Sequence, residues 1–276
     1  ALPPPLSEHA LLLRRLITAA ERDERVRFVE LCCSIARGAG DRESDVDVGL
    51  GVADESFAGA LGDMPALVAG LAEVVDSLGH QIAEWGDVPH RRLFVQYASG
   101  VQLDLVVMPA STRRGLPPNS VALLDRDSRL STPWQPSTLA VDAIAIREWA
   151  FLGWIALADL TKHLRRGSVW EALDRLADAR RNIWRLWAAA HDLPYPLFGL
   201  TAVLDAENVD LPPGIERTVA SLDGAELLSA ARACAALLSD VGESACRRLG
   251  ADAPDAMAAL VRRKLETLRA EDIPHR

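Results

Sequence analysis

The sequence has few cysteines, no apolar run long enough to cross a membrane, and no excess of positive charge. Cys32, Cys33, Cys234 and Cys246 lack the paired spacing of a zinc finger, which predicts reduced thiols in a cytoplasmic protein rather than a metal centre or a disulfide framework. The first residues, "ALPPPLSEHA", have no basic stretch followed by an apolar one, so we expect no signal peptide.

The longest apolar run, "WAFLGWIALA" at 149–158, lies between Glu148 and Asp159. A membrane-spanning helix needs about 20 apolar residues, so this run predicts a buried helix and no membrane association. The formal net charge of −9 disfavours nucleic acid as a partner and favours cationic ligands.

The composition, 49% hydrophobic and 25% charged, is typical of a globular protein, and 276 residues suffice for two domains. Alternating patterns predict strands at 26–32 and 45–50 and two more on either side of Ala98-Ser99-Gly100. Residues 65–79 predict a helix and 80–85 a further strand. We therefore expect residues 1–110 to form an α/β domain with a mixed sheet.

Residues 111–138 are rich in Pro, Ser, Arg and Gly, which predicts a long connection without strands. Beyond it the pattern predicts one long helix or two at 139–167 and another at 169–192, followed by about three shorter ones. The predicted fold class is thus α+β, in which an all-α bundle, 139–276, follows the sheet domain.

Asp45 and Asp47 stand one residue apart on a predicted strand. A strand has a side-chain period of two, so both carboxylates lie on one face, with Cα atoms roughly 6.5–7 Å apart. Ionised carboxylates this close repel each other unless a cation lies between them. Hard divalent ions such as Mg²⁺ bind such oxygens, and a pair of them can align an attacking hydroxyl with a leaving pyrophosphate.

Asp104 lies in "VQLDLVVMP", where the apolar residues share the opposite face of the strand. An acidic side chain in such a strand is costly to bury without a partner. If this strand lies beside 45–50, Asp104 completes a cluster of three carboxylates.

The loop "CSIARGAGDRES" precedes the aspartate pair. Its backbone N–H groups, the Ser34 hydroxyl and the Arg37 guanidinium can hold a triphosphate. Gly38 and Gly40 allow the chain to turn sharply and approach a ligand.

The stretch "SIARGAGDRESDVDVGL" resembles the signature of the nucleotidyltransferase superfamily that includes DNA polymerase beta and the aminoglycoside nucleotidyltransferases. The matching residues are Ser34, Ala36, Arg37, Gly38, Ser44, Asp45, Asp47 and Asp104. The resemblance implies an N-terminal nucleotidyltransferase domain in which Asp45, Asp47 and Asp104 bind two Mg²⁺ ions and act as the catalytic residues. It also implies that Ser34, Arg37 and Ser44 contact the nucleotide.

In such enzymes a helical second domain closes over the nucleotide and holds the acceptor. Lys162 is the candidate for reaching the triphosphate, and the alternative is a solvated helix end where cations favour the macrodipole. Glu148 could act as a second base, or it could be an exposed residue of an amphipathic helix.

The predicted function is metal-dependent transfer of a nucleoside monophosphate, from ATP or another NTP, to a hydroxyl of a small cationic acceptor. An aminoglycoside would fit the acidic surface, and the activity would then be antibiotic resistance. Two alternatives stay open: nucleotide transfer to protein or tRNA, and a degenerate nucleotide-binding protein. Cys33 motivates the latter, because it stands where the family has a glycine. The sequence does not indicate an oligomeric state.

Overall fold

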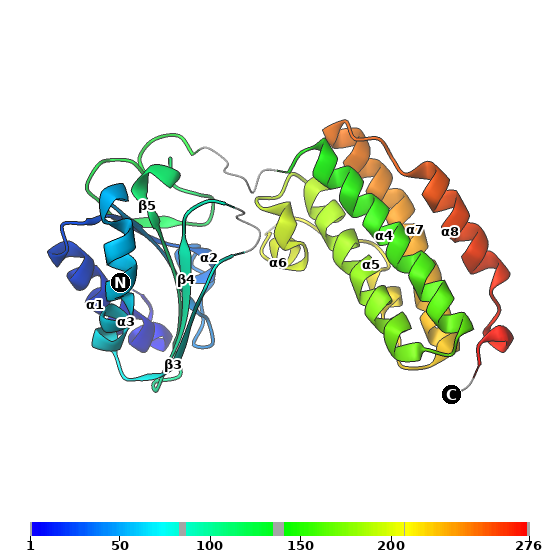
Figure 1. Cartoon of the computed structure of the whole chain (residues 1–276), viewed down its shortest axis with the longest axis horizontal. Helices are drawn as coiled ribbons and strands as arrows, with labels where there is room; N and C mark the ends of the chain where they lie inside the picture. The colour runs from blue at the N-terminus through cyan, green and yellow to red at the C-terminus, as the bar shows by residue number, and fades with distance from the viewer. Residues whose placement is uncertain (1, 83–86, 135–140, 207, 275–276) are drawn as a thin grey trace. The chain divides into compact units, whose positions relative to one another are not determined.

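The protein divides into two compact units, Ala1–Thr138 and Leu139–Arg276 (Figure 1). The computed structural model describes residues 2–82, 87–134, 141–206 and 208–274. The first unit contains a mixed β-sheet with helices, and the described part of the second contains helices and turns but no strands. The predicted α+β class is therefore confirmed.

In the described part of the first unit, one sheet has the strand order β3-β4-β5-β2-β1-β6. The strands are β1 (Val26–Leu31), β2 (Val46–Val52), β3 (Val74–His80), β4 (Arg91–Tyr97), β5 (Gln102–Pro109) and β6 (Val121–Asp125). β2 and β5 run parallel, and the other neighbours are antiparallel. The two strands that carry the aspartates are thus neighbours at the centre of the sheet.

One face of the sheet is covered by α1 (Ser7–Arg22) and α3 (Phe57–Leu71), which lie on the same side of it (Figure 1). Helix α1 buries Leu12, Leu16 and Ala20, which recur at helical spacing. These side chains pack with the alternate apolar residues of β2 and β5, all of them buried. This core leaves the intervening residues of β2 and β5 on the opposite face.

The opposite face of β2 continues from Asp47 to Gly49 and Gly51. A Cβ at Gly51 would lie 1.9 Å from the Phe28 ring, and a Cβ at Gly49 would lie 2.5 Å from a carboxylate oxygen of Glu30. The glycines therefore allow two large side chains of β1 to cross over β2. Phe28 then packs in a second, smaller core with the residues Met108, Ala110 and Leu130.

The helix predicted at 65–79 is wrong in position. Helix α3 ends at Leu71, and Val74–His80 form strand β3, which pairs antiparallel with β4. The β-branched pair Val74-Val75 favours a strand, and pairing with a distant segment decides the outcome. The strand predicted at 80–85 therefore begins where β3 ends, and residues 83–86 lie outside the described part of the chain.

The segment 111–138, which is predicted to be a connection, also contains a strand. Its residues Val121–Asp125 form β6, an edge strand that pairs with β1, with Leu124 opposite Val29. Residues 135–138 lie outside the described ranges. The segment therefore belongs to the sheet of the first unit.

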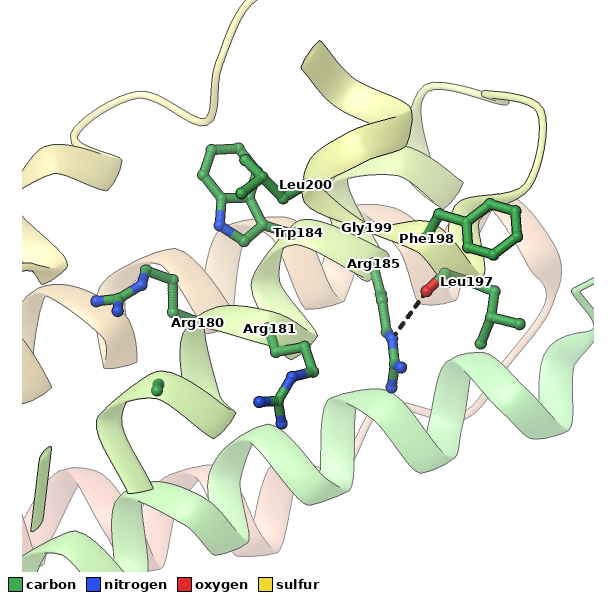
Figure 2. Close-up of a pocket in the computed structure, with 9 residues that line it drawn as sticks. Arg180, Arg181, Trp184, Arg185, Leu197, Phe198, Gly199 and Leu200 are labelled. Atoms are coloured by element: carbon green, nitrogen blue, oxygen red, sulfur yellow. Dashed lines mark hydrogen bonds between the residues drawn. The ribbon is translucent and has the colours of Figure 1, made fainter. Parts of the chain in front are cut away.

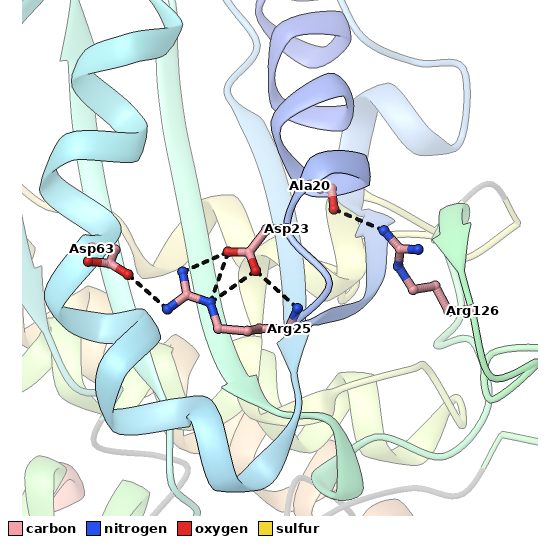
Figure 3. A network of polar contacts seen from close by, with 5 residues as sticks. All are labelled: Ala20, Asp23, Arg25, Asp63 and Arg126. Atoms are coloured by element: carbon pink, nitrogen blue, oxygen red, sulfur yellow. Dashed lines mark hydrogen bonds and ion pairs between the residues drawn. The ribbon is translucent and has the colours of Figure 1, made fainter.

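A network of ion pairs and hydrogen bonds stabilises the turn between α1 and β1 (Figure 3). The Arg25 guanidinium bonds to Asp23 at 2.7 Å and to Asp63 of α3 at 2.8 Å. Arg126, which follows β6, donates to the carbonyl oxygens of Ala20 and Glu21 at the end of α1. Cations near the last carbonyls of a helix complement its dipole, so these contacts hold α1 against the sheet.

The second unit is built from the antiparallel pair α4 (Ala143–Arg165) and α5 (Val169–Ala190), with α6 (Leu200–Leu204), α7 (Gly224–Leu249) and α8 (Asp255–Thr267). The predicted long helices correspond to α4 and α5. The expectation that only shorter helices follow is wrong, because α7 has 26 residues against 23 in α4. In the part of the chain that the structure describes, no helix combines the length and the apolarity that a bilayer crossing requires.

Candidate active site

Asp47 and Asp104 are direct partners in the ladder between β2 and β5. Paired residues of a parallel ladder project to the same face of the sheet. Asp45 immediately precedes β2 and lies close enough for the charge of Asp104 to raise its pKa. Val46 and Leu103, each next to one of these aspartates in sequence, are fully buried on the other face. The three aspartates that the sequence singles out thus lie close together on two neighbouring strands.

The closeness of these carboxyl groups affects their pKa values. Burial raises the pKa of Asp47 from its ordinary value of 3.8 to about 6, and the negative charges of Asp104 and Asp45 contribute to that rise. Burial and the charge of Asp104 also raise the pKa of Asp45. The cluster is therefore a place where added positive charge would be favourable.

Arg92 of β4 supplies one positive charge. Its guanidinium bonds to both carboxylate oxygens of Asp104, with Nε 2.7 Å from Oδ1. The same guanidinium lies over the Phe94 ring, 4.1 Å from the centroid, which fixes its position further. Sequence reasoning missed Arg92. The alternation of "RRLFVQY" places it on the aspartate face, but only the register of β4 against β5 makes it a partner of Asp104.

The carboxylates are not arranged as a ready three-ligand metal centre. Among the described residues, no group of three or more His, Cys, Asp or Glu side chains is placed to hold one ion. Asp45 and Asp47 fit a hard divalent ion, because they are carboxylates that destabilise each other when ionised. Asp104 could bind such an ion only after Arg92 releases at least one of the Asp104 carboxylate oxygens.

The loop between β1 and β2 begins with a short helix, α2 (Cys33–Ala36), which carries Ser34. Arg37 ends this helix, and Gly38 follows with φ of +80°, a conformation that glycine adopts without strain. Ser44, which is also predicted to contact the nucleotide, has a partner within the loop itself. Its hydroxyl accepts from the Asp41 N–H at 2.9 Å, which closes the loop just before Asp45.

His9 of α1 is a second residue that sequence reasoning missed. Its Nε2 donates to the Ser44 carbonyl at 2.8 Å, and its ring is buried. The charge of His9 also acts to lower the pKa of Asp45. His9 therefore ties α1 to the backbone that positions Asp45, and nothing in the local pattern around residue 9 distinguishes it from a core position.

Cys33 has a left-handed backbone conformation, with φ of +60°, and its thiol hydrogen-bonds to Asp47. A side chain in this region costs roughly 1–2 kcal/mol, whereas glycine adopts it freely. The glycine expected from the family resemblance would thus suit this backbone better than cysteine does.

We expect Cys33→Gly to stabilise the first unit by about 1 kcal/mol, because it removes the Cβ strain. Urea unfolding, with hydrogen exchange of β1 and β2, measures the effect. Cys33→Ala is the matched control, since it removes the thiol but keeps the Cβ. Equal stability of the two variants would show that strain at residue 33 is unimportant.

The raised pKa of Asp47 predicts a pH dependence of stability. Between its ordinary pKa of 3.8 and about 6, the folded protein binds a proton that the unfolded chain has released. Asp47 therefore lowers the free energy of unfolding as pH rises through this window, by about 3 kcal/mol at most. In metal-free buffer, the unfolding free energy of Asp47→Asn should lack this pH-dependent contribution. The difference between the wild-type and variant profiles of unfolding free energy against pH then isolates it. Parallel profiles would contradict the prediction.

The remaining two candidates, Lys162 and Glu148, lie on α4 in the second unit. The Lys162 ammonium pairs with Asp159 at 2.6 Å on a part-exposed surface near the end of the helix. Glu148 is exposed. Both side chains are therefore accessible on the surface of α4.

Comparison with known proteins leaves the chain without an assigned family. No family model matches it, and no curated protein matches it. One matching solved structure is the crystal structure of an aminoglycoside 6-adenyltransferase from Bacillus subtilis. The two are 17% identical, the match covers 95% of this chain and 99% of the other, and the TM-score is 0.42. At this level of likeness, the activity of this chain has to be argued from its own residues.

Proposed function

We propose that this protein is a metal-dependent nucleotidyltransferase that transfers a nucleoside monophosphate, from ATP, to a hydroxyl group of a small acceptor. The observation that carries the proposal is the pairing of Asp47 with Asp104 on adjacent parallel strands, with Asp45 immediately before β2. Carboxylates that lie close together in a sheet repel each other, so such an arrangement indicates a functional role. Raised pKa values are also typical of functional sites.

In the proposed reaction the acceptor oxygen forms a bond to the α-phosphorus, the bond to pyrophosphate breaks, and the hydroxyl proton passes to a carboxylate. Asp45 and Asp47 would hold the divalent ions, and Asp104 would contribute as a third ligand and accept the proton. Ser34 and Arg37 would contact the phosphates, with Lys162 as a further candidate. When bound, the ions would neutralise the charge that develops on the phosphate oxygens.

The acceptor is proposed to be cationic, and an aminoglycoside is the first candidate. The net charge of −9 supports this choice through long-range attraction. The test is to incubate the purified protein with ATP and Mg²⁺ and to measure pyrophosphate release across a panel of aminoglycosides and neutral antibiotics. Release with a cationic compound, together with a product that is heavier by one adenylyl group (AMP less one water), supports the proposal. No release with any compound contradicts a small-molecule acceptor.

Arg92 supplies a test of the metal site that needs no acceptor. We expect Arg92→Gln to raise the affinity of the nucleotide-free protein for Mn²⁺ by about tenfold, because Asp104 is freed from a charge-assisted bond worth about 1.5–3 kcal/mol. Calorimetry or electron paramagnetic resonance measures the affinity. Arg91→Gln, at the exposed neighbouring position, is the control. Weaker or unchanged Mn²⁺ binding would show that Arg92 does not compete for Asp104.

A second candidate function, a degenerate nucleotide-binding protein, is favoured by two observations. Arg92 occupies both oxygens of the third aspartate, and Cys33 stands in a conformation suited to glycine. Nucleotide binding without pyrophosphate release, in both the wild type and Cys33→Gly, would favour this function over catalysis.

A further inference from the structure

Arg92 of β4 lies at the carboxylate cluster of the first unit, and its charge acts on all three aspartates. Its guanidinium bonds to both carboxylate oxygens of Asp104. The same charge acts to lower the pKa of Asp45 and that of Asp47, against the burial that raises both. A cation that belongs to the chain therefore stands where the proposed metal ions would also be attracted.

The ion pair between Arg92 and Asp104 lies where water reaches it. The Arg92 side chain is 28% exposed and that of Asp104 is 10% exposed, whereas the carboxylate of the Glu30–Arg113 pair is fully buried. Opening a fully buried pair leaves an uncompensated charge in the interior, which is strongly destabilising. Arg92 can turn to another anion at less cost, because its side chain already contacts solvent and a metal ion would take its place beside Asp104.

The Phe94 ring supports the guanidinium independently of this ion pair. The Arg92 Cζ atom lies 4.1 Å from the ring centroid, within the range of a cation–π contact. Phe94 is also the direct ladder partner of Asp104, and its ring stacks on His80 with 5.5 Å between the centroids. The guanidinium therefore has a support beside the site that does not depend on Asp104.

The balance of charge gives Arg92 a reason to change its partner. Three ionised carboxylates and one guanidinium leave the cluster net negative. With two divalent ions added, the cluster becomes net positive, and the guanidinium is repelled from it. The triphosphate of a nucleotide restores negative charge beside the guanidinium, and guanidinium groups bind phosphate oxygens through paired hydrogen bonds.

Arginines of the second unit differ from Arg92 in the partners that they hold. Figure 2 shows a pocket of about 340 Å³ beside α5, whose lining includes Arg180, Arg181 and Arg185. The first and the last of these donate to backbone carbonyl oxygens, and Arg181 pairs with Asp178. These partners are groups of the helical bundle itself. Arg92 instead pairs with a carboxylate that the proposed reaction needs, so this is the partner that has to be given up.

Resting on the function proposed above, we propose that Arg92 exchanges Asp104 for the phosphate oxygens of the nucleotide when the nucleotide and its metal ions bind. Arg92 is then a competitor of the metal ion in the free protein and a catalytic residue in the complex. The exchange leaves Asp104 available as a ligand and as the proton acceptor. It also couples metal binding to nucleotide binding, because each favours the state in which Arg92 has left Asp104.

Two titrations of the full chain test this exchange, and neither depends on turnover. The first is the Mn²⁺ titration of the nucleotide-free protein, in which Arg92→Gln should bind about tenfold more tightly. The second titrates, at saturating Mn²⁺, an ATP analogue in which a methylene group replaces the oxygen between the α- and β-phosphorus. There Arg92→Gln should bind about tenfold more weakly, because Asp104 is free of residue 92 in both proteins and only the phosphate contact is lost.

The opposite signs of these two changes distinguish an exchange from simpler roles of Arg92. A general disturbance of the site would weaken both affinities, and a guanidinium that only blocks Asp104 would leave analogue binding unchanged or make it tighter. Arg91→Gln, at the exposed neighbouring position of β4, is the control for the loss of one positive charge and should change neither affinity by more than about twofold. Arg92→Lys keeps the charge and should bind the analogue more tightly than Arg92→Gln does.

The outcomes for Arg92 and for the proposed function are separable. If the wild type releases pyrophosphate, Arg92→Gln should lower kcat about a hundredfold, the effect of one lost contact to charge in the transition state. Analogue binding without pyrophosphate release would contradict nucleotidyl transfer, and the two titrations would still decide whether Arg92 exchanges. If Arg92→Gln binds the analogue as tightly as the wild type at saturating Mn²⁺, or if the wild type does not bind it, the exchange is overturned.

Discussion

Asp47→Asn is expected to reduce the proposed nucleotidyl transfer by about a thousandfold or more. The charges of Asp45 and Asp104 both act on Asp47, so an amide at this position removes the central carboxylate of the proposed metal site. Loss of metal-ion stabilisation of the transition state removes several kcal/mol, and each 1.36 kcal/mol is a factor of ten in rate. Initial rates of pyrophosphate release at saturating ATP measure the effect.

Asp76→Asn is the control for this substitution. Asp76 lies on β3 of the same sheet, is exposed, and bonds only to the neighbouring Ser77 N–H in the contacts described. It should leave the rate within about twofold, because surface changes of this kind shift free energies by about 0.5 kcal/mol or less. Retention of transfer by Asp47→Asn within about tenfold of the wild type would remove the aspartate cluster from the mechanism.

Breaking the Glu30–Arg113 ion pair is expected to destabilise the first unit by about 3–5 kcal/mol. Glu30 is fully buried, and the Arg113 guanidinium lies 2.6 Å from its carboxylate with only 15% of the side chain exposed. Arg113→Met would leave a carboxylate without its counter-charge in the interior. Burial already raises the pKa of Glu30, and Arg113 opposes that rise.

The double variant Glu30→Met/Arg113→Met should recover most of that loss, because apolar side chains of similar volume replace a buried pair at little cost. Arg27→Met is the matched control. Arg27 lies on the same strand and pairs with Asp127, but both side chains are about one-third exposed, and such pairs contribute about 0–1 kcal/mol.

Urea unfolding should be combined with hydrogen exchange of β1, because a chain of two units need not unfold in one step. If Arg113→Met and Arg27→Met lower the free energy of unfolding equally, the buried ion pair contributes no more to stability than the exposed one. In that case the second core around Phe28 and the pairing of β6 with β1 would suffice to hold the segment after β5 against the sheet.

The strands that carry the aspartates follow from their local pattern. In "DVDVGL" the valines and leucine alternate with aspartates, and this period of two is a property of the segment itself. The same pattern in "VQLDLVV" isolates Asp104 on a polar face. Helical periodicity likewise predicted α4 and α5, because a helix of that length is decided by its own pattern of apolar residues.

The errors fall where pairing with a distant segment competes with local preference. Val74–His80 became a strand because β4 is available to pair with it, and Val121–Asp125 became one because β1 has a free edge. Both are edge strands. β3 is mostly exposed, and β6 is exposed at its start and partly buried at its end, so neither shows the alternation that marks a half-buried strand.

From its residues alone, the chain determines that three acidic side chains stand on apolar strands beside a glycine-containing loop, since strand periodicity and turn chemistry act over a few neighbouring residues. Tertiary structure decided which groups those acids meet. Arg92 reaches Asp104 through the register of β4, and Arg113 reaches Glu30 across 83 residues of sequence. Such contacts depend on how elements that are distant in sequence pair and pack, and the local sequence pattern does not determine that.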